Sequence, residues 1–144
     1  MKEEYEQLKL ENQLCFPLYA CAKEIVRKYK PFLDPLDLTY TQYITMMVLW
    51  ARKQVTVKQL GECLWLDSGT LTPLLKKLEH KGYIIRRRSD TDERNVVITI
   101  TEQGEALRAQ AADIPARMGQ YVKISAEDAM TLHRILYDIL RGME

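Results

Sequence analysis

The sequence has few of the residues that mark disordered, secreted or metal-binding chains. Its 144 residues include 6 glycines and 5 prolines, while 47% are hydrophobic and 28% are charged, which is ordinary for a packed domain. The three cysteines form no CxxC pair, and there are only two histidines. An odd cysteine count argues against a disulfide framework, and the lack of a Cys/His cluster argues against a zinc site. We therefore expect one folded domain over residues 1–144, without a metal or a cofactor.

Long apolar runs and a targeting signal are also missing. No stretch approaches the roughly 18 apolar residues of a membrane helix. The first residues, MKEEYEQLKLENQ, are acidic and polar instead of basic and then apolar. These features predict a cytoplasmic protein with no membrane partner.

The near balance of charge, 21 Lys and Arg against 20 Asp and Glu, conceals a basic segment. Between Arg52 and Arg94 there are ten basic residues against six acidic ones, whereas the two flanks together carry eleven against fourteen. Charge alone favours a solvated surface. A nucleic-acid interpretation also needs a shape that fits a groove.

The pattern of the first forty residues predicts two helices. Apolar residues recur at helical spacing over residues 8–30, and Pro31 is the expected end. Pro17 lies inside this stretch, so the ordered helix is expected to begin near it, with the preceding residues as a looser lead-in. Thr39 or Thr41 can cap a second, largely buried helix with the sequence TQYITMMVLWARK.

The basic segment predicts two helices separated by a short turn. Thr56 and Gln59 have capping-box spacing for a short helix, VKQLGECL. Asp67 or Ser68 can then cap a longer helix that ends at Gly82. Pro73 predicts a bend or a later start of this second helix. Two such helices form a helix-turn-helix.

After Gly82 the apolar period changes from 3.6 to 2, which indicates a β-hairpin over residues 83–88 and 95–101 with the charged tip SDTDER. Thr101 can cap a further helix, broken by Pro115, that continues toward Tyr121. Ser125 can cap a last helix with an apolar stripe. The predicted fold is mainly α with a small β-hairpin wing, a winged helix-turn-helix.

This shape suits DNA, because a second helix of this kind fits the major groove and a wing can reach a minor groove. The candidate contacts are hydroxyl donors at the helix start, lysines one turn on, strand arginines for phosphates and an arginine at the wing tip: Ser68, Thr70, Thr72, Lys76, Lys77, Arg86, Arg88 and Arg94. Taken singly, such hydroxyls are usually helix caps, and a basic strand is usually a solvated edge. Their combination within one segment favours DNA binding.

The stretch LDSGTLTPLLKKLEHKGYIIRRRSDTDERNVVITITEQG resembles the core of the MarR family of bacterial winged-helix regulators, including its wing signature at Asp92 and Arg94. The stretch QLCFPLYACAKEI, with Tyr29, Tyr40 and Thr41, resembles the OhrR branch of that family. The resemblance implies a repressor dimer with interlocked terminal helices and two reading heads on a palindromic operator of double-stranded DNA. Residues 8–38 and 102–144 would then form the dimerisation helices, and residues 39–101 the DNA-binding part.

The apolar stripes of the first and last helices independently favour a homodimer, since a two-fold dimer commonly buries such surface. An intramolecular helix pair is the alternative.

By the resemblance, Cys15 is a sensor of organic hydroperoxide, and Tyr19, Tyr29 and Tyr40 surround it, some from the partner subunit. Phenol donors or a helix N-terminus can stabilise a thiolate, which is the nucleophile. From the residues alone, Cys15 would be interpreted as a buried apolar filler.

Cys21 and Cys63 have no assigned role. On one helix Cys15 and Cys21 would lie about 9 Å apart along the axis and on different faces, beyond disulfide reach. Cys63 is expected in the core. The family's two-cysteine members use a C-terminal thiol, which this sequence lacks. The resemblance therefore implies a one-cysteine sensor whose sulfenic acid reacts with a low-molecular-weight thiol to form a mixed disulfide.

Two other functions compete with this hypothesis. One is a MarR-type regulator released by a small phenolic or other ligand, with the cysteine incidental. The other is a thiol peroxidase that turns over at Cys15, although the sequence shows no turnover apparatus and an enzyme would not need a wing.

Overall fold

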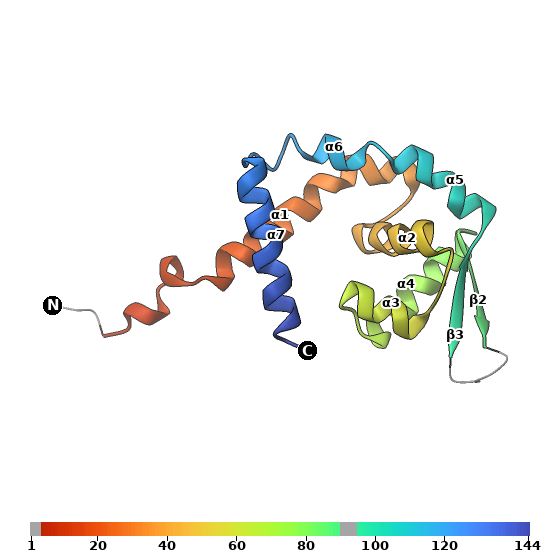
Figure 1. Cartoon of the computed structure of the whole chain (residues 1–144), viewed down its shortest axis with the longest axis horizontal. Helices are drawn as coiled ribbons and strands as arrows, with labels where there is room; N and C mark the ends of the chain where they lie inside the picture. Colours follow the sequence, from red (N-terminus) through yellow and green to blue (C-terminus); the bar gives the residue numbers. More distant parts are fainter. Residues whose placement is uncertain (1–3, 90–94) are drawn as a thin grey trace.

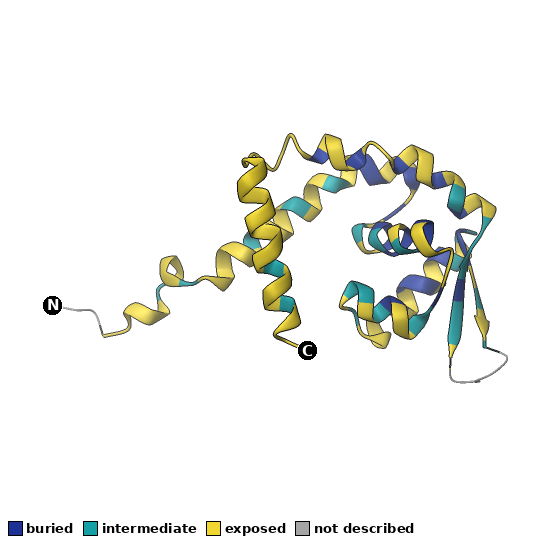
Figure 2. Cartoon of the chain, in the orientation of Figure 1, coloured by how far each residue is buried: buried dark blue, intermediate teal, exposed yellow. Residues whose placement is uncertain are grey.

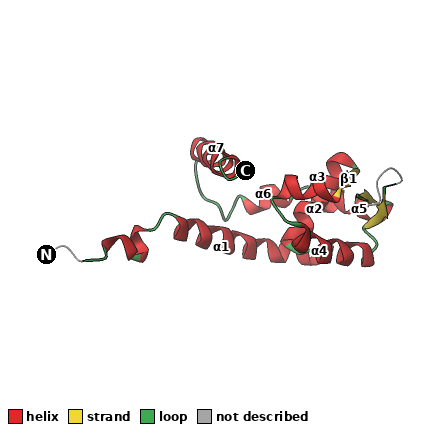
Figure 3. Cartoon of the chain, turned by 90° about the horizontal axis from the view of Figure 1, so that it is seen from below, coloured by secondary structure: helices red, strands yellow, loops and turns green. Residues whose placement is uncertain are grey.

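A computed structural model describes residues 4–89 and 95–144 of the chain. It is mostly helical with a small three-stranded antiparallel sheet, so the predicted fold class is confirmed (Figure 1). The sheet and the helices around it form a head at one end, and the long first helix leads away from it toward the N-terminus. The last helix stands apart from the rest of the chain when the molecule is turned by 90° (Figure 3).

The first long helix, α1, spans Cys15–Leu33. It is preceded by two single turns, η1 (Glu6–Leu8) and η2 (Leu10–Asn12), so the ordered helix begins near Pro17 after a looser lead-in, as predicted. Pro17 is the third residue of α1, where its missing N–H would have no partner within the helix. The predicted end at Pro31 is wrong. The helix continues through Phe32 and Leu33 beyond Pro31, because both side chains are buried.

Two capping boxes begin the next helices as predicted. Thr39 caps α2 (Tyr40–Arg52), and its hydroxyl oxygen accepts the Gln42 N–H at 3.3 Å while Gln42 Oε1 accepts the Thr39 N–H at 3.0 Å. Thr56 and Gln59 repeat this arrangement at the start of α3 (Val57–Leu64). Each reciprocal pair satisfies two backbone donors that a helix start leaves without partners.

The second helix of the pair, α4, spans Ser68–His80. Asp67 Oδ1 accepts the Thr70 N–H at 2.7 Å, so Asp67 is the cap. The helix begins before Pro73, and the expectation of a later start there is wrong because this cap already fixes the first turn. Gly82, with φ of +83°, ends the helix as predicted, since only glycine adopts this conformation without strain.

The sheet has the order β1-β3-β2, with β1 at Gln54–Thr56, β2 at Ile84–Arg88 and β3 at Val96–Ile100. The β2–β3 hairpin is confirmed, with Arg86 opposite Ile98. The sequence did not predict β1, in which Val55 pairs with Ile98 from the other side. A strand of three residues is too short to show alternation.

Three helices follow the sheet. Thr101 caps α5 (Glu102–Ala111), and Ser125 caps α7 (Ala126–Arg141) by accepting the Asp128 N–H at 3.0 Å. The helix α6 spans Ile114–Met118, and Pro115 is its second residue. The break between α5 and α6 therefore precedes Pro115. Pro115 therefore starts a helix instead of breaking one, consistent with the tolerance of proline in a first turn.

The hydrophobic core lies where α2 meets α4, the sheet, α5 and the end of α1 (Figure 2). Its fully buried side chains include Met46, Leu49, Leu60, Leu78 and Ile98. By contrast, α7 has no buried residue. In the described part of the chain, no helix combines the length and the apolar character needed to span a membrane.

Candidate functional site

The exposed face of α4 carries the predicted groove contacts. Leu71, Leu74, Leu75 and Leu78 are buried on the opposite face, which turns Ser68, Thr70, Thr72, Lys76 and Lys77 outward. The structure thus brings these five predicted residues together on one surface.

The hydroxyls at the start of α4 also serve the helix. Hydrogen bonds from Thr70, first from its backbone N–H and then from its side chain, hold the pKa of the Asp67 carboxyl below its ordinary value. The Thr72 hydroxyl donates to the Ser68 carbonyl oxygen at 2.8 Å. The capping interpretation and the groove-contact interpretation are compatible, because the hydroxyl oxygens at the start of α4 can still accept a hydrogen bond from a bound molecule.

The strand arginines divide into two groups. Arg86 is held by Glu79 of α4: its Nη2 and Nε donate to Glu79 Oε1 at 3.0 and 3.2 Å, and its backbone N–H donates to Oε2 at 3.0 Å. Hydrogen bonds from the Arg86 side chain, and then from its backbone, hold the pKa of Glu79 below its ordinary value. Arg87 and Arg88 are exposed. Arg86 therefore fastens β2 to α4, while Arg88 faces solvent. Asp92 and Arg94 lie outside the described residues.

A cleft of about 670 Å³ lies between α3, α4 and the hairpin, whose residues Arg86, Asn95 and Val96 line it. Leu71 and Leu75 line it with apolar surface, and Ser68, Thr72 and Arg86 supply polar groups. Sequence reasoning missed this cleft, because it arises only when the hairpin packs beside the helix pair.

Cys15 is the first residue of α1 and is exposed in the single chain. Tyr19 lies one turn further along the same helix and is 63% exposed. The Lys23 amino group lies 5.9 Å from the centre of the Tyr19 ring. Cys15 and Tyr19 are thus neighbours on an open helix surface, and the interpretation of Cys15 as a buried filler within this chain is wrong.

Tyr29 and Tyr40 lie elsewhere, in an aromatic cluster with Tyr43. The ring centroid of Tyr29 lies 4.9 Å from that of Tyr40 and 5.7 Å from that of Tyr43. Burial is the main cause that raises the pKa of each of the three phenols, and the mutual charge effect adds to it for Tyr29 and Tyr43. Sequence reasoning missed Tyr43, which the apolar run of α2 conceals.

The sensor residues are therefore separated within one chain. Tyr29 follows Cys15 by fourteen positions in α1, which places it about 21 Å further along the helix axis. The structure pairs Cys15 with Tyr19 and Tyr29 with Tyr40, and keeps the two pairs apart.

The other cysteines do not approach Cys15 as disulfide partners. All three are free; Cys21 is exposed, and Cys63 is half-buried on α3 instead of fully in the core as expected. Among the described residues, no group of three or more His, Cys, Asp or Glu side chains could hold a metal ion.

Comparison with known proteins assigns the chain to a family. The family described as "Transcriptional regulator SarA/Rot" matches residues 27–110. The chain is also 49% identical over 143 residues to the organic hydroperoxide resistance transcriptional regulator of Bacillus subtilis, covering 99% of this chain and 97% of that protein. The chain belongs to the SarA/Rot family of transcriptional regulators. The predicted resemblance to MarR-type, OhrR-like regulators is confirmed by the same relative.

Two further relatives of this SarA/Rot-family chain are staphylococcal. It is 48% identical over 120 residues to the regulator SarZ of Staphylococcus aureus, covering 83% of this chain and 81% of SarZ. The structure of reduced AbfR bound to DNA superposes with a TM-score of 0.79 at 29% identity, covering 98% of this chain and 99% of AbfR. The structure of the disulfide form of AbfR superposes with a TM-score of 0.66 at 32% identity, covering 94% of this chain and 95% of that chain. The SarA/Rot-family chain is a DNA-binding transcriptional regulator, not an enzyme.

Proposed function

We propose that the chain is a homodimeric repressor that binds a palindromic operator and releases it when Cys15 is oxidised by an organic hydroperoxide. The observation that carries this proposal is the separation of Cys15 and Tyr19 from Tyr29 and Tyr40 within one chain. A two-fold dimer can bring the pairs together, because each α1 then presents its cysteine end to the tyrosine end of its partner. The name of the B. subtilis relative supplies the class of oxidant.

The exposed apolar surface outside the head supports the dimer. Along α7 the side chains of Leu132, Ile135 and Ile139 are 46%, 41% and 40% exposed. On α1, Phe16 and Leu18 are each 43% exposed. A helix with an apolar stripe is stable in water only when that stripe is covered, and a second copy of α1 and α7 offers the same kind of surface. Residues 8–38 and 102–144 are proposed to form this dimerisation region.

DNA binding is proposed to follow winged-helix geometry. The N-terminal residues Ser68, Thr70 and Thr72 of α4 would face base edges in the major groove, and Lys76 and Lys77 would neutralise phosphates. Arg88 extends this basic surface along β2, and Arg94 with Asp92 is assigned to the wing tip from the sequence alone. Arg86 is proposed to contribute through the position of β2, because its guanidinium is held by Glu79.

The proposed redox step starts with attack of the Cys15 thiolate on the terminal oxygen of the hydroperoxide. The O–O bond breaks, the alcohol leaves after taking up a proton, and the sulfur becomes a sulfenic acid. A low-molecular-weight thiol then attacks the sulfenic acid and expels water, which leaves a mixed disulfide. A phenol with its ordinary pKa of about 10 is protonated at neutral pH, and burial raises the pKa values of Tyr29 and Tyr40 further, so both can donate hydrogen bonds to this sulfur site.

The testing experiment has two stages. Selection from a random duplex pool with reduced protein is expected to recover an inverted repeat with half-sites about one helical turn apart. Cumene hydroperoxide is then added to the complex, followed by dithiothreitol. Release by the peroxide and rebinding after reduction support the proposal. Binding that ignores the peroxide but ends with a small phenol such as salicylate would instead favour the regulator whose cysteine is incidental.

A further inference from the structure

The three residues that follow α4 form a corner between the recognition helix and the sheet. We call Lys81, Gly82 and Tyr83 the 81–83 corner. The Gly82 N–H donates to the Glu79 carbonyl oxygen at 2.9 Å, and the Tyr83 N–H donates to the Leu78 carbonyl oxygen at 3.1 Å. The corner is therefore continuous with the last turn of α4, so any rotation of the corner also rotates α4.

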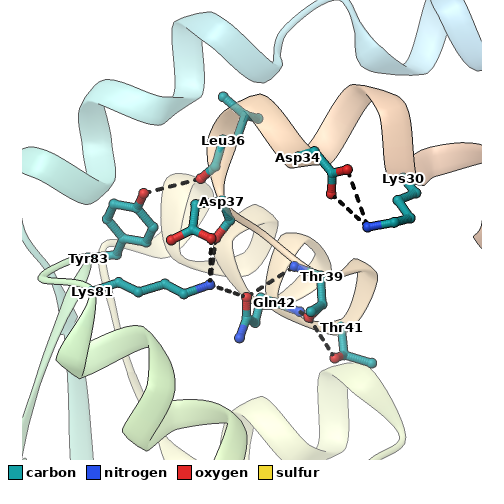
Figure 4. Close-up of polar contacts among 9 residues, drawn as sticks. All are labelled: Lys30, Asp34, Leu36, Asp37, Thr39, Thr41, Gln42, Lys81 and Tyr83. Carbon is teal, nitrogen blue, oxygen red and sulfur yellow. Dashed lines mark hydrogen bonds and ion pairs between the residues drawn. The ribbon is translucent and has the colours of Figure 1, made fainter.

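The side chains of this corner reach the connection between α1 and α2 (Figure 4). Lys81 Nζ donates to the Asp37 carbonyl oxygen at 2.6 Å and to Gln42 Oε1 at 3.0 Å. The Tyr83 hydroxyl donates to the Leu36 carbonyl oxygen at 3.1 Å. These bonds join segments that lie about forty residues apart in the chain.

The receiving segment follows directly on α1. The single turn η3 (Asp34–Leu36) continues from the end of α1, and Asp37 then takes the left-handed conformation with φ of +53°. This conformation is uncommon for a residue with a side chain, and aspartate tolerates it better than most. Asp37 thereby presents its carbonyl oxygen to Lys81, and its carboxylate oxygen Oδ1 lies 3.6 Å from the same amino group.

The side chains of Lys81 and Tyr83 are largely shielded from solvent. Tyr83 is 8% exposed, and the side chain of Lys81 is 23% exposed. Burial, followed by the charge of Asp37, raises the pKa of Tyr83. Gln42 Oε1 also accepts the Thr39 N–H, so the amino group of Lys81 is tied to the cap of α2 as well.

The corner is also bonded to the start of α5. The Thr101 hydroxyl donates to the Gly82 carbonyl oxygen at 2.6 Å, and the Thr101 N–H donates to the Tyr83 carbonyl oxygen at 3.1 Å. The ends of α1 and α4 and the start of α5 therefore meet at three consecutive residues. Hydrogen bonds are directional, whereas apolar packing is not, so these bonds fix angles between the helices.

We propose that Lys81 and Tyr83 are positioning residues for DNA binding, which fix the angle of α4 relative to the end of α1. This inference rests on the proposed function, in which α1 belongs to the dimerisation region and α4 enters the groove. In a two-fold dimer an angle fixed in each subunit also fixes the separation of the two recognition helices. The corner therefore sets which half-site spacing the dimer accepts.

The test compares reduced full-length dimers on a set of duplexes that carry the selected inverted repeat with its spacer shortened or lengthened by single base pairs. Lys81→Met removes the ammonium donor together with its charge at similar side-chain volume, and Tyr83→Phe removes only the hydroxyl donor. Lys2→Met and Tyr5→Phe change residues that precede the proposed dimerisation and DNA-binding regions in the sequence, and they serve as matched controls. Circular dichroism and gel filtration establish folding and dimer state for each variant.

The parent and the controls are expected to show a sharp optimum of spacing. The double variant Lys81→Met/Tyr83→Phe should lose about tenfold in affinity at that optimum and much less at spacers one base pair away, because the heads are then free to adapt. An equal loss at every spacer, or an unchanged optimum, overturns the positioning role. If the double variant does not fold, each single variant is expected to broaden the optimum, and a single variant with a sharp optimum overturns the role of that residue. A parent protein that binds no inverted repeat would instead contradict the proposed function itself.

Discussion

The ring of Tyr29 lies 4.9 Å from the ring of Tyr40, at the end of α1 remote from Cys15. Dimers made of two different variant chains can test whether each sensor site combines the cysteine of one subunit with the tyrosines of the other. A dimer of a Cys15→Ser chain with a Tyr29→Phe/Tyr40→Phe chain has one intact composite site. We expect it to release DNA on addition of cumene hydroperoxide, whereas neither parental homodimer releases at the normal rate.

The matched control places all three substitutions on one chain and pairs it with an unchanged chain. A site shared between subunits is then damaged in both positions, and release should be lost. Should this control release normally while the first mixed dimer does not, the sensor site lies within one subunit, and the shared site is refuted.

The single cysteine variants test which thiol is needed. Cys15→Ser should bind DNA and stay bound in the presence of organic hydroperoxide, whereas Cys21→Ser and Cys63→Ser should still release. In the proposed dimer, oxidation adds bulk at a site that the partner covers, and a coupling of about 1–3 kcal/mol would correspond to roughly 5–150-fold in DNA affinity. Titration of labelled operator before and after oxidation measures this ratio. Loss of the response in Cys21→Ser or Cys63→Ser would require a mechanism with two thiols.

Substitutions of the hairpin arginines are expected to affect different properties of the protein. Arg94→Ala is expected to lose about 1–3 kcal/mol of binding free energy as a groove contact, and Arg88→Ala to lower the salt dependence of binding by about one phosphate contact. Arg86→Ala should lower the free energy of unfolding by about 1 kcal/mol, because its partner Glu79 lies across the α4–β2 junction. Binding isotherms at several salt concentrations, with thermal unfolding, distinguish these effects. Unchanged unfolding of Arg86→Ala would contradict its structural assignment.

The ion pair of Glu79 with Arg86 should give a pH-dependent stability. The folded-state pKa of Glu79 is lowered, so its contribution is complete above its unfolded value of about 4.3 and is lost as the pH falls through the lower folded value. The unfolding midpoint of Glu79→Gln should therefore lie below that of the parent at pH 7, and the gap between the two should narrow as the pH falls below about 4.3. Glu62→Gln, at an exposed position, controls for the loss of one negative charge. A constant gap down to pH 3 would exclude the pair as its cause.

The apolar stripe of α7 should hold the dimer together. Ile135→Glu introduces a charge into that stripe and is expected to shift gel-filtration elution toward the monomer and to abolish cooperative binding of the inverted repeat. Met130→Glu is the matched control, because Met130 is 74% exposed and lies away from the stripe on the same helix. Dissociation by Met130→Glu but not by Ile135→Glu would place the interface on the other face.

The helix starts could be predicted because each depends on a few adjacent residues. Thr39, Thr56, Asp67 and Ser125 all cap the helices expected of them, since a short polar side chain beside a helix start satisfies its free N–H groups wherever the helix packs. The C-terminal end of α1 was predicted wrongly because it depends on distant contacts. Pro31 is accommodated where Phe32 and Leu33 enter the core, and this packing is not visible in a local pattern.

The candidate site was only partly predictable for the same reason. The outward face of α4 follows from its leucine spacing, but the pairing of Arg86 with Glu79 requires β2 to fold back beside α4. The distance between Cys15 and Tyr29 follows from helix geometry once α1 is known to be continuous from Cys15 to Leu33. Strand β1 and the bonds of Lys81 depend on segments far apart in the chain, and no motif marked them.

The position of β2 in the sheet has a consequence for solubility. Within the described sheet β2 is an outer strand, and outer strands can pair with strands of other molecules and lead to aggregation. Here the Arg86 N–H is occupied by Glu79 Oε2, and the exposed charges of Arg87 and Arg88 repel an approaching copy of the same strand. The basic residues assigned to DNA would therefore also keep the regulator from joining edge to edge while it is off its operator.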